Sequence, residues 1–527
     1  MFLRALSVMG ILVFFGSCFW VSSGVGSMQN SPDERANYLF AQHISDGEAM
    51  SFSEPANTEV QGIIHPRSMA ALGEKIVPGS FLGLPVLAGF FGFIDENLIF
   101  IVTPLLAVLA VLAWFSLVKK MFENRWLAYL ASFFLAIHPA FWYYAGRPLM
   151  HNVGFVSFLI LAAWVWMVKP VKNSWTFLNP LLGGFFLAWA LAFRSAEAIW
   201  VLPAVIILFA VGFRKKFFSF KDLLFSLGGF VVILLPFLLL NFSLYGSPFL
   251  TGYTLPASSS AVSSVVVETS WMTSIAQTIF PFGIHEMNIV QAVWHYGFLL
   301  YPTFGLLALL GIGVLLVGWK KESPAWKRYF FTLLPVVCWL VVVYGSWKFN
   351  DNPDPFAITI GNSYARYWLP IFALLSPFMA RAILWIADVP YPRLKQGILV
   401  VILLASLGAS GWVVFGGEDG FIKTREHLAQ NLEKKEIILA ATPDNAIIIV
   451  DRADKYLFPD RRVVVPLRSD VTYDRIDELA SIAPLYYFGI TLPDVDIDYL
   501  NTTILGPHAL ILDRLVTVGE ETLYAIE

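Results

Sequence analysis

Residues 97–118 read NLIFIVTPLLAVLAVLAWFSLV and contain no charged side chain. A helix of this length rises about 33 Å, enough to cross a hydrocarbon layer about 30 Å thick. Comparable apolar runs recur at 2–22, 126–145, 151–168, 175–193, 196–213, 222–240, 294–317, 329–346, 365–387 and 397–415. The sequence therefore predicts about eleven transmembrane helices.

The composition of the 527 residues is typical of a membrane protein. Hydrophobic residues make up 57% of the chain and charged residues 14%, whereas soluble domains carry about 25% charged residues. The formal net charge of −3 offers no basic excess, so we expect no nucleic-acid partner. Both cysteines, Cys18 and Cys338, lie in apolar runs, which excludes a disulfide framework and a thiolate metal site.

Charge divides the chain near residue 416. Residues 416–527 hold 20 acidic and 11 basic side chains, and residues 1–415 hold 18 and 24. This contrast predicts an all-α polytopic membrane domain over 1–415 and a small soluble domain over 416–527. The apolar stretch 446–450 follows Pro443-Asp444-Asn445, which predicts a strand in a small α/β structure. We identify no catalytic constellation in this second domain.

The basic residues predict the orientation in the membrane. The apolar run 81–94 has only 14 residues and contains Gly83 and Pro85, so we expect it not to span the bilayer. Every basic loop then falls on the cytoplasmic side. These loops carry Lys119, Lys120, Arg125, Lys169, Lys172, Arg214, Lys215, Lys216, Lys221, Lys320, Lys321, Lys327, Arg328, Arg393 and Lys395.

We expect the protein to lie in the plasma membrane. The predicted orientation places its N-terminus in the cytoplasm. The first outer loop, 23–96, the loop 241–293 and the C-terminal domain are then extracytoplasmic. We expect residues 1–22 to be a retained span, although the Ser22-Ser23-Gly24 sequence also fits a cleaved signal peptide. Both alternatives give the same topology for the rest of the chain.

A helix is predicted to begin directly after the first span. Ser31 with Glu34 three residues later, and Pro32 between them, is the pattern of a capping box with proline in the first turn. Apolar residues from Ala36 onward recur at helical spacing and define one face. Asp33 falls near that face and Glu34 almost opposite it, so we expect Glu34 to close the cap in water and Asp33 to point toward the membrane domain.

Ionisable side chains also occur at the outer ends of the predicted spans, where burial makes them costly unless they are used. Arg194 and Glu197 have the i, i+3 spacing of an ion pair, and we interpret them as structural. Arg366 has no comparably close acid in the sequence, which favours an anionic ligand such as a phosphate. The remaining residues of this kind are Arg147, His151 and Lys348.

Four ordered segments resemble one known family. They are Asp33-Glu34, Gly146-Arg147 through Asn152, Asn241-Phe242-Ser243-Leu244-Tyr245-Gly246-Ser247-Pro248 with Gly252-Tyr253, and Ala365-Arg366-Tyr367-Trp368-Leu369-Pro370. This order is similar to that of GT-C type, polyprenyl-phosphate-dependent membrane glycosyltransferases. The protein O-mannosyltransferases and the lipid A aminoarabinose transferase are the most similar in style. The resemblance covers most of residues 1–415, including the number and orientation of the spans.

The resemblance implies transfer of a sugar from a polyprenyl-phosphate donor to an acceptor on the outer face of the membrane. The first-loop carboxylates Asp33 and Glu34 become the catalytic candidates, with Asp33 as general base in an inverting displacement. Cationic side chains are needed for the donor phosphate, and the candidates are Arg366, Arg147 and Lys348. Further substrate contacts are expected at His65, Arg67, His151, Tyr253 and Tyr367. The acceptor class, whether protein, lipid or glycan, stays open.

The chain departs from some family members at Pro148-Leu149-Met150-His151-Asn152, which lacks a second acidic residue. A metal site with two carboxylates is therefore not expected, and we assign no cofactor. Asp33 with His65 and His151 offers carboxylate and imidazole ligands that suit zinc or manganese, so a divalent cation remains an alternative.

Two other classes of function compete with transfer. A transporter or flippase for a lipid-linked or small anionic substrate is the main alternative, because such proteins are also polytopic. We find no internal repeat, and the charges cluster at span ends rather than at the mid-membrane positions typical of transporters. A scaffold that displays the acidic C-terminal domain would not explain the carboxylate-headed helix after the first span.

Overall fold

The computed structural model describes residues 2–21, 28–168, 177–255, 279–349, 351, 354, 356–388 and 391–527. Lys169, Lys172, the sequence Ser22-Ser23-Gly24 and part of the predicted loop 241–293 lie outside the described residues. The chain forms two compact units. The first comprises Met1–Val21, Phe100–Leu235 and Val266–Thr424; the second comprises Ser22–Ile99, Pro236–Val265 and Arg425–Glu527.

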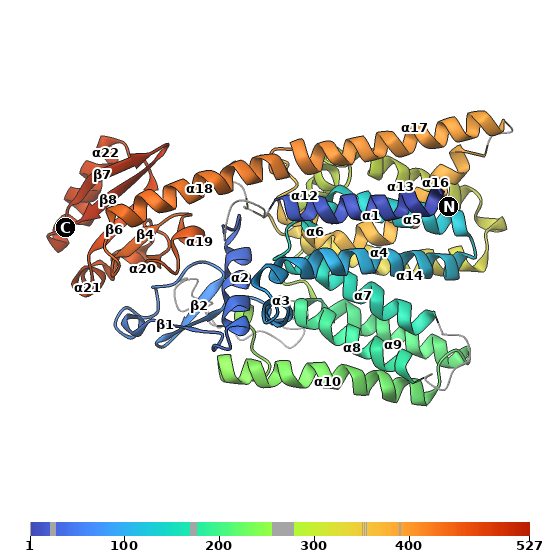
Figure 1. Ribbon diagram of the computed structural model, residues 1–527, viewed down its shortest axis with the longest axis horizontal. Coiled ribbons are helices and arrows are strands. Elements are labelled where there is room, and N and C mark those ends of the chain that lie inside the picture. Colours follow the sequence, from blue (N-terminus) through green and yellow to red (C-terminus); the bar gives the residue numbers. More distant parts are fainter. Residues whose placement is uncertain are drawn as a thin grey trace. The chain divides into compact units, whose positions relative to one another are not determined.

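The first unit is helical (Figure 1). Its helices are α1 (Phe2–Trp20), α4 (Val102–Phe122), α5 (Arg125–Ile137), α6 (Pro139–Ala145), α7 (His151–Met167), α8 (Leu178–Phe193), α9 (Ala198–Arg214), most of α10 (Phe220–Tyr245), α12 (Glu286–Ala292), α13 (Pro302–Val317), α14 (Pro324–Ser346), α15 (Ser363–Tyr367), α16 (Leu369–Ile386), α17 (Pro392–Gly411) and the start of α18 (Phe421–Ala441). Short 3₁₀ or π segments are η3 (Ser195–Glu197), η5 (Val293–Leu299), η6 (Trp319–Lys321) and η7 (Trp412–Gly416).

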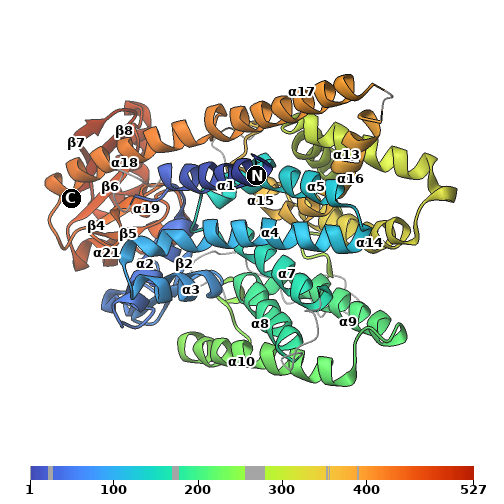
Figure 2. The same cartoon turned by 45° about the vertical axis from the view of Figure 1, so that its right-hand side comes forward.

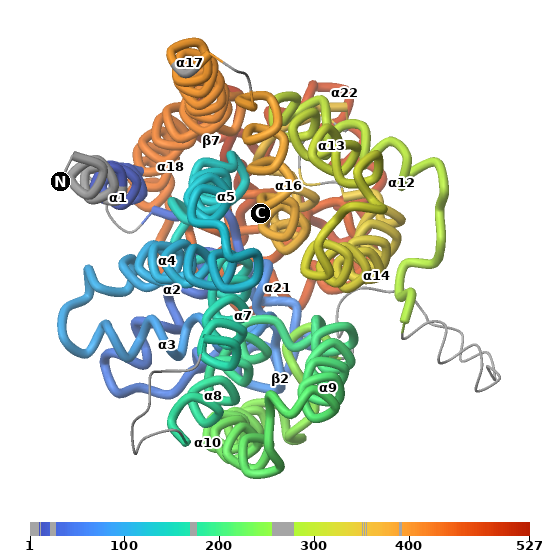
Figure 3. The backbone as a smooth tube through the Cα atoms, turned by 90° about the vertical axis from the view of Figure 1, so that its right-hand side faces the viewer, coloured from blue at the N-terminus to red at the C-terminus, as the bar shows by residue number. Residues whose placement is uncertain are grey.

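Glycines allow the helices of this unit to pack closely. Helix α7 packs against α4 and α8, and α16 packs against α5 and α13, as the view of Figure 3 along several of these helices shows. A Cβ atom on Gly311 of α13 would lie 1.9 Å from the backbone oxygen of Phe378 in α16. Only glycine permits that approach, as is common between membrane helices.

Six helical stretches among the described residues are long and apolar enough to span a membrane, or seven if the pair Glu286–Leu299 and Pro302–Val317, bent by 101°, counts as one span. Four shorter apolar helices are Gly83–Gly92, Arg125–Ile137, His151–Met167 and Leu178–Phe193. The expected run 126–145 is broken into α5 and α6 because Pro139 begins a new helix. The count of about eleven spans is not confirmed and stays a prediction.

The N-terminal part of the second unit contains α2 (Pro32–Ser45) and α3 (Gly83–Gly92), with the 3₁₀ segment η1 (Pro55–Thr58) and most of the 3₁₀ segment η2 (Glu96–Ile101). Strands β1 (Phe52–Ser53), β2 (Met69–Leu72) and β3 (Lys75–Pro78) form an antiparallel sheet in the order β1-β3-β2. The ten residues of α3 rise about 15 Å, half of a hydrocarbon layer. Segment η4 (Gly252–Thr254) also belongs to this unit.

The C-terminal part of this unit contains a mixed sheet in the order β5-β4-β6-β8-β7 (Figure 2). Its strands are β4 (Ile447–Val450), β5 (Arg462–Val464), β6 (Leu485–Ile490), β7 (Leu512–Val518) and β8 (Glu521–Ile526). The helical segments are α19 (Asp454–Leu457), α20 (Asp470–Tyr473), α21 (Ile476–Ile482), α22 (Asp494–Tyr499), η8 (Leu500–Ile504) and η9 (Gly506–His508). The expected strand over 446–450 is thus β4.

The first outer loop contributes to the core of this sheet. Val60, Ile63 and Ile64 are buried in the same cluster as Ile447 of β4 and Leu479 of α21. Ile64 also forms an isolated antiparallel bridge with Val464. The second unit therefore joins residues that lie some 400 positions apart, and the separate domain over 416–527 stays a prediction.

Candidate functional site

Helix α2 begins as its sequence predicts. The Ser31 side chain accepts a hydrogen bond from the Glu34 backbone N–H at 3.3 Å, and Glu34 Oε2 accepts one from the Ser31 N–H at 3.1 Å. The capping box is confirmed. The expectation that Glu34 lies in water is wrong, because its exposed fraction is 3%. Helix α2 packs against α3, α19 and β3, so it is covered on more than the apolar face that the periodicity defines.

Asp33 is half-buried, and its Oδ1 accepts a hydrogen bond of 2.6 Å from the hydroxyl of Ser68. Ser68 directly precedes β2, so the turn that carries His65 and Arg67 lies beside the head of α2. The structure thus brings three predicted site residues, Asp33, His65 and Arg67, into one region of the second unit.

The contacts of His65 and Arg67 restrict the roles that these two side chains can have in the site. His65 Nδ1 lies 2.9 Å from the Pro66 carbonyl, and burial lowers the pKa of its imidazole, which favours the neutral ring. Arg67 donates through Nε and Nη2 to Asp454 in α19. Arg67 is therefore held by an ion pair with the C-terminal part of the unit.

Tyr253 lies in η4, and its ring is 4.8 Å from that of Phe81. The backbone beside it approaches β3 so closely that a Cβ on Gly252 would lie 2.2 Å from the Gly79 carbonyl carbon. Only glycine fits at that position. Tyr245, at the end of α10, donates a hydrogen bond of 2.9 Å to the Pro78 carbonyl, so the segment after α10 is fixed to the first outer loop.

Two of the predicted phosphate-binding cations lie in the first unit, Arg366 in α15 and Arg147 directly after α6. Arg366 donates through Nη2 to Ser363 Oγ at 2.8 Å and lies 3.5 Å from the Met150 sulfur. Arg147, with an exposed fraction of 5%, donates to Tyr143 Oη at 3.3 Å. Met150 connects the two arginines, because its backbone N–H also donates a hydrogen bond of 3.1 Å to the Arg147 carbonyl.

Tyr144 links this cluster to the segment before α15. Its hydroxyl donates to the carbonyl of Ile360 at 3.1 Å and lies within hydrogen-bond distance of the next two carbonyls. Asp351 accepts a hydrogen bond of 2.6 Å from the Ser363 N–H. The segment before α15 is therefore held both by Tyr144 and by Asp351. Sequence reasoning missed Tyr144, although it lies two residues before the Gly146-Arg147 pair.

Tyr367 lies on a buried ionic network. The Tyr344 ring stacks on it at 4.6 Å, and the guanidinium carbons of Arg194 and Arg366 lie 4.5 and 5.2 Å from its centroid. Arg194 pairs with Glu197 at 2.8 Å with both side chains buried, which confirms their predicted pairing.

Two more predicted residues flank the cations. His151 begins α7 next to Met150 and is buried, with its ring 6.3 Å from that of Phe193. Lys348 is exposed, and its neighbour Phe349 packs against Tyr367 at 5.3 Å. Among the described residues, no group of three or more His, Cys, Asp or Glu side chains could hold a metal ion.

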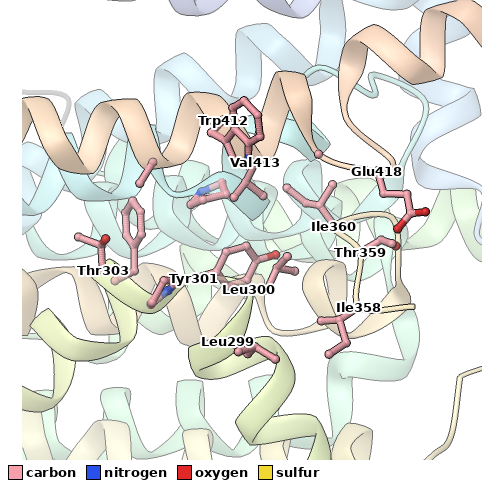
Figure 4. A pocket seen from close by; sticks show the side chains of 15 residues that line it. Leu299, Leu300, Tyr301, Thr303, Ile358, Thr359, Ile360, Trp412, Val413 and Glu418 are labelled. Carbon is pink, nitrogen blue, oxygen red and sulfur yellow. The ribbon is translucent and has the colours of Figure 1, made fainter. Parts of the chain in front are cut away.

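A pocket of about 430 Å³ adjoins the segment that Tyr144 holds (Figure 4). Ile358, Thr359 and Ile360 form one wall, and residues of η5, α13, α17 and η7 form the others. Figure 4 shows Tyr301, Trp412 and Val413 around the space, with Glu418 at one end. Its lining is mostly apolar, as in most pockets that bind small molecules.

Comparison with known proteins supports the resemblance. A family model described as dolichyl-phosphate-mannose-protein mannosyltransferase matches residues 82–240. No curated protein matches the chain. The fold is similar to that of ArnT from Cupriavidus metallidurans bound to undecaprenyl phosphate, with a TM-score of 0.58 and 10% identity over 99% of this chain and 98% of that one.

The apo state of the same ArnT gives a TM-score of 0.57 and 11% identity, over 100% of this chain and 98% of that one. At such low identity the likeness concerns the fold. The match over residues 82–240 and the shared fold over the full length confirm the resemblance of this chain to GT-C type membrane glycosyltransferases.

Proposed function

We propose that this protein is an integral-membrane glycosyltransferase that takes its sugar from a polyprenyl-phosphate donor. The fold is similar to that of ArnT, whose structure was solved with bound undecaprenyl phosphate. This similarity supports a lipid phosphate as the donor. The mannosyltransferase family match over residues 82–240 supports sugar transfer as the reaction.

The contact of Met150 with both Arg147 and Arg366 is the observation that carries this proposal, because it brings two arginines from distant parts of the chain to one residue. Planar guanidinium groups match phosphate geometry and form strong, charge-assisted hydrogen bonds with phosphate oxygens. The mostly apolar pocket is lined by Ile360, whose carbonyl accepts from Tyr144, and it provides space for an apolar chain. A phosphate esterified to a polyprenyl chain combines both properties.

In the proposed reaction, Asp33 acts as general base on the acceptor at the outer face of the membrane. Its carboxylate takes the proton from the acceptor hydroxyl or amine. The nucleophile forms a bond to the anomeric carbon, and the bond from that carbon to the phosphate oxygen breaks. Polyprenyl phosphate leaves with the electron pair, and the anomeric carbon is inverted. Arg366 and Arg147 stabilise the charge that develops on the leaving phosphate, with Lys348 as a further candidate.

Lipid binding tests this assignment directly. Native mass spectrometry of the purified chain should detect bound undecaprenyl phosphate, and Arg366→Ala and Arg147→Ala should each weaken that binding by about tenfold or more, as expected for a charge-assisted hydrogen bond. Arg125→Ala is the matched control, because Arg125 lies 5.2 Å from the Tyr129 ring just as Arg366 does from Tyr367. Unchanged binding in both site variants would refute the phosphate assignment.

A further inference from the structure

We infer that the C-terminal part of the second unit positions Asp33, with Asp454 and Lys455 of α19 as the residues that do so. This inference rests on the proposed function, because it assumes that Asp33 is the general base. The link runs from Asp454 to Arg67, from Arg67 to the adjacent Ser68, and from the Ser68 hydroxyl to Asp33. All of these residues belong to one compact unit.

Ser68 has a backbone conformation that the surrounding structure must impose. Its φ of +62° is uncommon for a residue other than glycine. The Gly79 N–H donates a hydrogen bond of 3.0 Å to the Ser68 carbonyl, and a Cβ on Gly79 would lie 2.8 Å from that carbonyl group. Strained conformations of this kind persist where the structure holds them in place and are concentrated at functional sites. Here the strained residue is the one that donates to Asp33.

Asp454 holds the other side of Ser68. Its carboxylate is 0% exposed and accepts from the Arg67 backbone N–H at 2.9 Å as well as from Nε and Nη2 of the same residue. Arg67 Nη2 also donates to the Arg452 carbonyl at 3.2 Å. The backbone and the side chain of Arg67 are thus fixed by one segment that lies 387 residues later in the chain.

The next residue of α19 fixes the helix that carries Asp33. Lys455 Nζ donates to the Asn30 carbonyl at 3.0 Å, directly before the N-cap of α2. Arg35, in the first turns of α2, donates through Nε and Nη2 to the Phe458 carbonyl. The two partners of the Ser68 to Asp33 hydrogen bond are therefore both attached to α19 and its immediate neighbours.

Through these contacts the C-terminal segment acts in catalysis indirectly, because none of its residues needs to touch the substrate. A carboxylate held in one orientation by Ser68 can meet the acceptor proton repeatedly in the same geometry, and small errors of position can lower rates by up to about 100-fold. Asp454, Lys455, Arg67 and Ser68 are accordingly positioning residues.

Ser68→Gly is the most informative variant. Glycine adopts positive φ without strain, so the variant should fold at least as stably as the parent chain while losing the hydroxyl. We expect kcat to fall by about 10-fold to 100-fold, with the KM for the donor within about twofold of the parent value. The probe is release of undecaprenyl phosphate from undecaprenyl-phosphate-linked mannose, or from the related sugar that the parent chain turns over fastest. A purely structural Ser68 would give unchanged kcat in this variant.

Asp454→Asn and Lys455→Gln test the role of α19 on the full-length chain, with thermal unfolding measured in parallel. Both should lower kcat more than they change KM, and Lys455→Gln remains usable if Asp454→Asn does not fold. Glu54→Gln is the control, because Glu54 pairs with Arg462 at 3.1 Å between the same parts of the unit but does not contact Ser68. Loss of kcat in Glu54→Gln equal to that in Asp454→Asn would overturn the positioning role.

Asp33→Asn separates failure of this inference from failure of the proposed function. An active Asp33→Asn variant would refute Asp33 as the base, and the positioning role with it. An inactive Asp33→Asn variant combined with parent-like kcat in Ser68→Gly, or in a folded Lys455→Gln, would refute the inference alone.

Discussion

Replacing Asp33 and Glu34 one at a time distinguishes the base from the helix cap. Asp33→Asn keeps an oxygen that can accept from the Ser68 hydroxyl, now at 2.6 Å, but removes the basic group. Loss of general-base assistance lowers turnover by roughly 10²–10⁴-fold, equivalent to about 2.7–5.4 kcal/mol of activation free energy. The free energy of unfolding should change by only about 1 kcal/mol, because one charged hydrogen bond becomes a neutral one.

Glu34→Gln should show the opposite balance. Glu34 Oε2 accepts from the Ser31 N–H and hydroxyl at 3.1 and 3.3 Å, and glutamine supplies one carbonyl oxygen that can accept from both. We expect a loss of about 0.5–2 kcal/mol in the free energy of unfolding, as for other weakened helix caps, and turnover close to that of the parent chain. The buried position of Glu34 does not change this, since glutamine has nearly the same shape.

The assay measures donor turnover and thermal unfolding on the same preparations. Glu48→Gln is the control, because Glu48 is an exposed carboxylate in the same outer loop. Turnover of Asp33→Asn within about tenfold of the parent value would refute the reasoning. If Glu34→Gln folds normally but is inactive, the two residues exchange roles.

Three further predictions concern topology, the donor phosphate and pH. In a cysteine-free chain, impermeant thiol reagents should label Asn288→Cys and Ser469→Cys in intact cells but not Lys215→Cys; labelling at Lys215 would refute the orientation. Arg366→Lys should not recover the activity lost in Arg366→Ala, because a point charge replaces a planar fork; recovery would show that charge alone suffices. Burial lowers the pKa of His65 in the folded state. The contribution of neutral His65 to the free energy of unfolding is therefore lost as the pH falls below about 6.5, the ordinary pKa of histidine. His65→Asn should make thermal unfolding less sensitive to acidification from about pH 7.5 to pH 5.5. Equal sensitivity in the variant would remove His65 as the cause.

Local features of this fold follow from short-range sequence patterns. The Ser31 to Glu34 spacing predicts the start of α2, and the Arg194 to Glu197 spacing predicts a buried ion pair, because each pair lies within one turn of a helix. Composition and charge predict a membrane protein. The number of spans does not follow from apolar length, because length alone does not show that Pro139 divides one apolar run into two helices.

The long-range features had no signal in the sequence. Glu34 is buried because α2 is buried on all sides from Glu34 to Ala41, and not only on the face that its apolar periodicity marks. Nothing in the residues around Ser68 indicates a hydrogen bond to Asp33, and Asp454 lies 387 positions from its partner Arg67. The burial of Glu34 and the hydrogen bond from Ser68 to Asp33 both depend on packing between residues that are far apart in the sequence.

Conversion of the donor by the purified chain tests the central claim most directly. Glycosyl transfer breaks the bond between sugar and phosphate, whereas transport or flipping leaves it intact. When the chain is supplied with a polyprenyl-phosphate-linked sugar and membrane extract as the source of acceptor, mass spectrometry should show free polyprenyl phosphate accumulating with the parent chain and not with Asp33→Asn. Intact donor in both samples, despite bound lipid, would contradict a transferase and favour a transporter.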